Sequence, residues 1–92
     1  MARIYQTSNM GEAGMRVAIV PDRGEADLLV HRVGSWGLAH GDAFWYITRN
    51  RDDATASIFM TSVGFAELTI HFVSTQGEAG WQRPHRLQGR LR

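Results

Sequence analysis

The sequence predicts a single-domain, all-β protein built from six or so short strands joined by glycine turns. Three observations support this fold class. The chain has 92 residues, which is too short for two domains that would each bury an adequate core. A short motif recurs roughly every 13 residues. An apolar segment of strand-forming residues follows each of the first five copies of that motif.

The repeat is marked by an alanine that stands two residues after a glycine. Gly-Glu-Ala occurs at residues 11–13, 24–26 and 77–79, and Asp52 replaces the glycine in one other copy. Because self-similarity at a fixed period indicates repeated structural units, we expect six equivalent corners in the fold. The anchor alanines are Ala13, Ala26, Ala39, Ala54, Ala66 and Ala79.

Each expected strand is a short segment rich in β-branched and aromatic residues and bounded by Gly, Asp, Asn, Ser or Pro. Taken alone, Ala26, Leu29 and Val33 could form one stripe of a helix, because periodicity cannot separate a short buried strand from a short helix. The repeat favours strands, because all the equivalent segments are short. In chain order the expected strands are residues 4–7, 15–20, 28–33, 44–48, 57–61 and 68–73.

The connections between these strands restrict how they can pair. They are too short for a helical crossover, which needs a dozen or more residues, so a βαβ arrangement is excluded. Antiparallel pairing and a compact β-winding both stay open. The corner glycines suggest backbone with positive φ or a close approach of two chains, and the alanines suggest tight packing over each corner.

A wider pattern links these repeats. Residues 41–46 are Gly-Asp-Ala-Phe-Trp-Tyr, residues 66–73 are Ala-Glu-Leu-Thr-Ile-His-Phe-Val, and Glu-Ala-Gly-Trp closes the pattern at 78–81. From Arg3 to Trp81 the chain resembles the septoil-knot family of small bacterial domains, although His31 and His71 stand where that family more often has an aromatic residue. The resemblance implies a compact β chain threaded into a deep seven-crossing knot. It carries over no catalytic residue.

The composition excludes several classes of function. A net charge of +1 with 43% hydrophobic and 21% charged residues is typical of a globular domain and indicates no partner. The absence of cysteine and of lysine excludes thiolate sites, cysteine nucleophiles, Schiff bases and P-loop lysines. No stretch approaches the roughly 20 apolar residues of a spanning helix. The N-terminus lacks a signal-peptide core, so we expect no membrane contact and a cytoplasmic location.

Glu12, Glu25 and Glu78 are the candidate acid–base residues, because paired carboxylates can divide proton donation and nucleophilic attack. Their equivalent places in the repeat predict similar environments, whereas acid and base roles require different ones. We therefore expect these carboxylates to accept hydrogen bonds from turn amides, and we predict no catalytic residue.

The four histidines are the candidate metal ligands, and none forms the close i, i+2 or i, i+4 pair that favours a metal site. His31 and His71 share one repeat position, which indicates a packing or half-exposed face. We predict no metal and no cofactor. The remaining histidines are His40 and His85.

The basic C-terminal tail, residues 83–92, differs in charge from the repeat domain, residues 1–82. The tail holds four arginines and no acid, whereas residues 1–82 hold six arginines and nine acids. Such a tail could contact nucleic acid phosphates, be a solvated terminus, or fold back onto the acidic body. The candidate nucleic-acid-binding residues are Arg83, Arg86, Arg90 and Arg92.

The aromatic residues could offer stacking platforms for bases or sugars, although a domain of this size needs most of them in its core. We expect core packing, with Trp45 and Tyr46 as the first positions to inspect for exposure. The aromatic residues considered are Trp36, Trp45, Trp81, Phe44, Tyr46, Phe65 and Phe72.

The expected function is therefore that of a structural or protein-interaction module without catalytic activity, as a monomer or a homodimer. A threaded chain must back out through its own loops to unfold, so the knot implies slow unfolding. The alternative is a nucleic-acid accessory protein that binds phosphates through its arginine tail. A third possibility is a small hydrolase built on the turn carboxylates.

Overall fold

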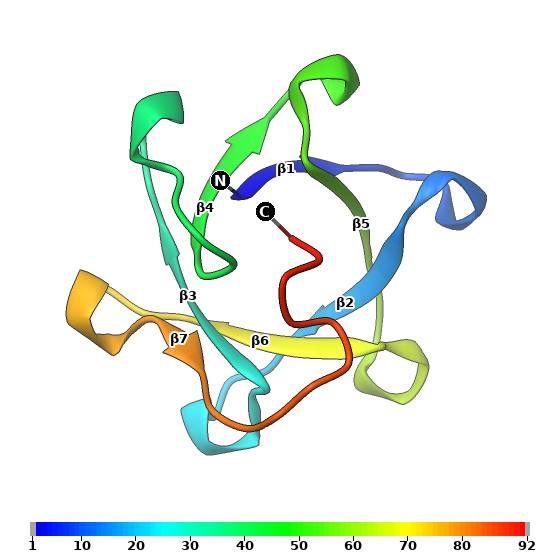
Figure 1. Ribbon diagram of the computed structural model, residues 1–92. Coiled ribbons are helices and arrows are strands. Elements are labelled where there is room, and N and C mark those ends of the chain that lie inside the picture. The colour runs from blue at the N-terminus through cyan, green and yellow to red at the C-terminus, as the bar shows by residue number, and fades with distance from the viewer. Residues whose placement is uncertain (1, 92) are drawn as a thin grey trace.

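The computed structural model describes residues 2–91, in which six five-residue strands alternate with six short 3₁₀ helices that form projecting corners (Figure 1). The expected all-β fold is confirmed, with strand ends within two residues of the predicted ones. A two-residue strand that the sequence did not predict follows the last corner. The strands are β1 (Ala2–Gln6), β2 (Met15–Ile19), β3 (Leu28–Arg32), β4 (Phe44–Thr48), β5 (Ala56–Met60), β6 (Leu68–Phe72) and β7 (Gly80–Trp81). The corners are η1 (Met10–Glu12), η2 (Arg23–Glu25), η3 (Trp36–Leu38), η4 (Arg51–Asp53), η5 (Val63–Phe65) and η6 (Gln76–Glu78).

The six long strands close into a barrel in the order β4-β1-β5-β2-β6-β3, because β3 also pairs with β4. All of these pairings are parallel, and only β7 pairs in the antiparallel direction, along the first half of β3. Of the two arrangements left open by the sequence, the structure therefore has the compact β-winding.

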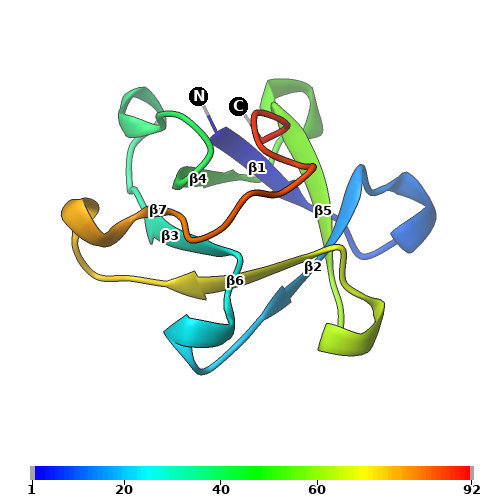
Figure 2. The same cartoon turned by 60° about the horizontal axis from the view of Figure 1, so that its bottom comes forward.

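Parallel pairing without helical crossovers is possible because the strands run around the barrel (Figures 1 and 2). The chain passes through β1, β2 and β3 on a first lap and through β4, β5 and β6 on a second lap in the same direction. Each second-lap strand lies between two first-lap strands, and no strand pairs within its own lap. The chain thus reaches a parallel neighbour by continuing around the ring instead of returning along the sheet.

The core follows from side-chain alternation along these strands. The central residues of β1, β2 and β3 are completely buried, and they are Ile4, Val17 and Val30. Trp45, the second residue of β4, is also completely buried. Flanking residues at two-residue spacing, such as Leu28 beside Val30, point into the same core. The barrel interior is therefore filled by side chains contributed in turn by both laps.

The corners have a different backbone from the one that the sequence predicted. The five repeat glycines do not adopt positive φ, so the first of the two explanations expected for the corner glycines is wrong. Each glycine instead occupies the middle of a 3₁₀ turn, and Gly11 and Gly24 donate to the side chain two residues earlier, Asn9 or Asp22, at 3.0 Å. The backbone N–H of Asp52 donates in the same way to the side chain of Asn50 at 3.0 Å. This hydrogen bond uses only the backbone of Asp52, which explains why an aspartate fits at the repeat position that glycine otherwise occupies.

The last segment, residues 83–91, crosses the barrel and is called here the C-terminal strap (Figure 1). Leu87 and Leu91 are buried in the main core cluster. Three alternatives were predicted for the tail, and in the structure its described residues are folded back onto the body. Within residues 2–91, no helix is long and apolar enough to cross a membrane.

Candidate functional site

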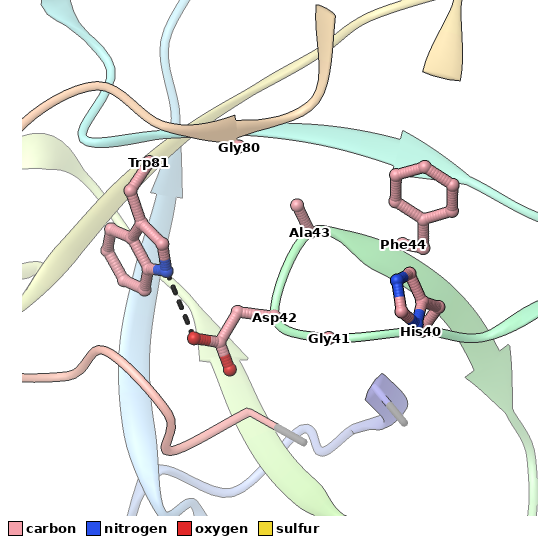
Figure 3. Close-up of a pocket in the computed structure, with 7 residues that line it drawn as sticks. All are labelled: His40, Gly41, Asp42, Ala43, Phe44, Gly80 and Trp81. Atoms are coloured by element: carbon pink, nitrogen blue, oxygen red, sulfur yellow. Dashed lines mark hydrogen bonds between the residues drawn. The ribbon is translucent and has the colours of Figure 1, made fainter. Parts of the chain in front are cut away.

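A hollow of about 330 Å³ opens where the η3–β4 connection meets β7. Its lining brings together the start of β4 and the two residues of β7, which are far apart in sequence (Figure 3). The lining residues are His40, Gly41, Asp42, Ala43, Phe44, Gly80 and Trp81.

The connection before β4 forms this hollow by turning sharply. His40 and Phe44 exchange backbone hydrogen bonds of 3.3 Å, and Gly41 between them has φ of +58°. A side chain would strain that left-handed conformation. The buried indole of Trp45 donates to the carbonyl oxygen of Asp42 at 2.6 Å, so the core tryptophan also fixes the turn.

The carboxylate of Asp42 joins three separate segments. It accepts a hydrogen bond from the indole nitrogen of Trp81 at 3.0 Å (Figure 3). It also accepts hydrogen bonds from the strap amides of Gly89 at 2.6 Å and Leu91 at 3.3 Å. A carboxylate that already accepts from three donors has little capacity left to act as a general base. Asp42 therefore serves as an anchor for the strap.

Aromatic rings form the remaining walls of the hollow. The ring of Phe44 packs edge-on against both His31 and His40, with ring centroids 5.7 Å apart in each case. On the other side Trp81 stacks on His85, with centroids 5.4 Å apart. Among the lining residues, these rings supply apolar surface and no nucleophile paired with a base.

The predicted nucleic-acid-binding arginines have different environments. Arg83 lies 3.2 Å from a carboxylate oxygen of Asp27, and Arg86 lies 3.0 Å from Glu67. Arg90 is exposed and lines a second hollow of about 350 Å³ between β2, β5 and the strap. Arg92 lies outside the described residues. The acids beside Arg83 and Arg86 belong to the body, so these two arginines hold the strap in place.

Glu67, which lies between η5 and β6, connects the strap to β2. The backbone N–H of Arg16 and the guanidinium of Arg86 both donate to its carboxylate at 3.0 Å. These hydrogen bonds, that of Arg16 first, lower the pKa of Glu67 because they stabilise its ionised form. Nearby, the His85 ring accepts a hydrogen bond from the Leu87 amide and contacts the Glu67 carbonyl oxygen.

The three repeat glutamates do not bind the turn amides as the sequence predicted. Glu12 pairs with Arg51, and Glu78 pairs with Arg23, each at 2.6 Å between neighbouring corners. The turn amides are instead bonded by the Asn and Asp side chains that directly precede three corners, which leaves Glu12 and Glu78 free to pair. A hydrogen bond from Thr75, followed by that from Arg23, lowers the pKa of Glu78.

The histidine pair that shares a repeat position lies on the outer surface of the sheet. His31 contacts the carbonyl oxygen of Val73 at 3.2 Å, and His71 contacts that of Val20 at 2.9 Å. Both histidines are half-buried, as the sequence predicted. In residues 2–91, no three His, Asp or Glu side chains gather in a group that could hold a metal ion.

The aromatic residues divide into core and surface sets. Trp45 is completely buried, so its predicted core role is confirmed. The prediction is wrong for Trp36, which is 49% exposed, for Phe65, which is 69% exposed, and for Phe72, which is 37% exposed. Trp36 and Phe65 belong to corners, which project away from the barrel, and Phe72 is the last residue of β6.

Two features of this region were not predicted from the sequence. The anchoring role of Asp42 was missed, although its position between Gly41 and an aromatic run separates it from the repeated corner acids. The contact between Arg3 and Trp36, with the guanidinium carbon 4.7 Å from the ring centroid, was also missed. No local pattern relates those two residues, because they meet only when β1 and β4 pair.

The fold and this region together define a repeat-built, closed β-barrel domain whose end is covered by its own C-terminal strap. The family described as the 7(1) septoil knot domain matches residues 1–82, so the chain belongs to that family. The match ends where the strap begins. No curated protein and no solved structure matches the chain.

Proposed function

We propose that this protein is a non-catalytic structural or protein-interaction module whose barrel is knotted and therefore unfolds slowly. The two-lap winding carries the proposal, because each lap is hydrogen-bonded to the other around the whole ring. To unfold completely, such a chain must pull one end through loops formed by the other lap. Membership of the septoil knot domain family supports the same conclusion.

The interaction role rests on the corners. Leu38 is 57% exposed and Val63 is 59% exposed, and each shares its corner with an exposed aromatic residue. Apolar side chains that project from rigid, ordered elements are suited to contact a protein partner at low entropic cost. The polar groups around Asp42 already bind one another, which favours a structural over a catalytic role.

The test is the rate of unfolding with and without an intact chain. A protease site is inserted in the exposed corner η5, and the folded protein is cleaved there. We expect the uncleaved protein to unfold in water with a rate constant below about 10⁻⁵ s⁻¹, at the slow end for small domains. The cleaved protein is expected to unfold at least about a hundredfold faster at matched stability, since its chain no longer has to be unthreaded.

The uncleaved insertion variant is the matched control, because it has the same composition and the same lengthened corner. Denaturant concentrations are chosen so that both forms have equal unfolding free energy. Equal unfolding rates for the two forms, or an uncleaved rate typical of ordinary β domains, would contradict the role of the knot.

A further inference from the structure

The inward-facing side chains of the barrel form stacked layers, each with one residue from every long strand. Because side chains alternate along a strand, residues two positions apart face the same side of the sheet. The middle layer is completely buried and consists of Ile4, Val17, Val30, Trp45, Ile58 and Ile70. Two residues further along each strand, at the carboxyl ends of the parallel strands, lies another layer. We call this layer the lower ring, and it consists of Gln6, Ile19, Arg32, Ile47, Met60 and Phe72.

The two ends of the barrel differ in their cover. The strap binds at the amino ends of the strands, where Leu91 is hydrogen-bonded to Asp42 before β4 and to Thr55 before β5. The lower ring has no comparable cover in residues 2–91, since each of its six residues is at least partly exposed. Ile19 is 53% exposed, and Phe72 is 37% exposed.

The exposed part of the lower ring is mostly apolar. Met60, Ile19 and Phe72 lie on three strands that are neighbours in the sheet, β5, β2 and β6. The ring of Phe72 packs edge-on against the buried ring of Trp45, with centroids 6.3 Å apart, so it has a fixed position. A contiguous apolar patch that the domain does not cover is typical of a protein-interaction surface.

One cation belongs to the lower ring. Arg32 is exposed and makes no ion pair with a described residue. On one side of β3, Arg32 is in register with Trp45 of β4, and on the other side Val30 is in register with Phe72 of β6. Arg32 therefore follows directly after the position of Phe72 and has apolar neighbours on both sides.

The strands supply no carboxylate for Arg32, because none of the six long strands contains an acid. The nearby acids lie elsewhere in the fold. Asp27 precedes β3 and lies at its opposite, amino end. Asp22, Asp52 and Asp53 directly precede or belong to corners, which project away from the barrel (Figure 1). The lower ring thus combines an apolar surface with one uncompensated cation.

We propose that the lower ring binds a segment of a partner protein that carries an apolar side chain beside a carboxylate. The carboxylate pairs with Arg32, and the apolar side chain covers Ile19 and Phe72. A second copy of this chain fits less well, because its own lower ring brings another arginine and no carboxylate to the interface. One arginine is also too few for a nucleic acid backbone or an anionic membrane, which are bound by several cations.

This proposal rests on the interaction role proposed above and assigns it a surface other than the corners. The test is fluorescence anisotropy of a labelled peptide with blocked ends, Asp-Leu-Phe-Asp-Leu, titrated with the full chain. Arg32→Gln is expected to weaken binding about tenfold, the loss that follows from one hydrogen-bonded charge. Ile19→Ala is expected to weaken binding roughly fivefold, since about half of this side chain is available for burial.

A second peptide, with Asn in place of both Asp residues, isolates the charge pair without changing the protein. It should bind the unmodified chain about tenfold more weakly than the Asp peptide does. It should also bind Arg32→Gln and the unmodified chain equally, because the interaction that the substitution removes is already absent.

Two matched controls distinguish the lower ring from the rest of the surface. Arg90→Gln removes an exposed arginine from the strap, at the opposite end of the barrel. Leu38→Ala removes a corner side chain that is 57% exposed, about as much as Ile19. Both should bind the Asp peptide as the unmodified chain does. Circular dichroism confirms that each variant is folded.

Three results would overturn the proposal. The first is that the unmodified chain does not bind the Asp peptide up to about 1 mM. The second is that Arg32→Gln and the Asn peptide leave the affinity unchanged, or that Leu38→Ala weakens binding while Ile19→Ala does not. The third is a dimer in sedimentation equilibrium that Ile19→Ala abolishes, which would make a second copy the occupant. The unfolding rates of the cleaved and uncleaved chains are measured independently, so failure of this proposal leaves the knotted structural role standing.

Discussion

Substituting Asp42 with alanine tests the anchoring of the strap. The change removes the acceptor for one indole N–H and two backbone amides. A hydrogen bond to a charged group contributes about 1.5–3 kcal/mol, and the three are not additive. The amides of Gly89 and Leu91 can regain water once the strap lifts. We therefore expect the unfolding free energy to fall by about 2–4 kcal/mol.

The assay combines urea denaturation with amide hydrogen exchange. Asp42→Ala should lower the urea midpoint and should increase exchange at Gly89 and Leu91 before it does so in the barrel strands. Asp53→Ala removes an exposed corner acid and should change stability by less than about 0.5 kcal/mol. If Asp42→Ala kept the original stability and the original protection of both amides, the assigned role of this carboxylate would be refuted.

Other substitutions test the packing, the charges and the corners. Leu91→Ala should cost about 2 kcal/mol in urea denaturation, the low end for a buried leucine because the strap can detach locally, whereas exposed Leu38→Ala should cost almost nothing. Hydrogen bonds lower the pKa of Glu67 in the folded state. The stability that Glu67 contributes is therefore present above about pH 4.3 and is lost as the pH falls through its lowered folded-state pKa. Glu67→Gln should remove that part of the acid dependence when melting temperatures are measured over a series of pH values. Asn50→Ala removes the acceptor for the Asp52 amide and should lower the melting temperature by an amount equivalent to about 1 kcal/mol. An unchanged melting temperature would show that the corner does not need this cap.

The strands could be predicted because their signals are local. The segment from Phe44 to Thr48 is short, aromatic and β-branched, and the structure has a strand with these same ends. The repeat then extended that assignment to less clear segments such as Leu28–Arg32. Pairing was beyond local signals, since Ile4 lies beside Ile47 and Ala56 only after the chain has completed a lap.

The corners show how one residue type can have two explanations. Glycine fits a left-handed turn, and it also fits a tight 3₁₀ turn whose amide donates to an Asn or Asp side chain. Asp52, which occupies the glycine position without positive φ, was the observation that separated them. The anchoring role of Asp42 depends on the strap, and no pattern in the sequence indicates where the strap returns.

The two-lap pairing also determines when the protein can fold during its synthesis. The strands β1, β2 and β3 pair only with later strands, so the nascent first half has no native partner as it leaves the ribosome. Its apolar strands remain unpaired until β4, β5 and β6 have been translated, and folding must wait for almost the whole chain. Fragments that contain one lap each should be unstructured alone and should depend on each other to assemble.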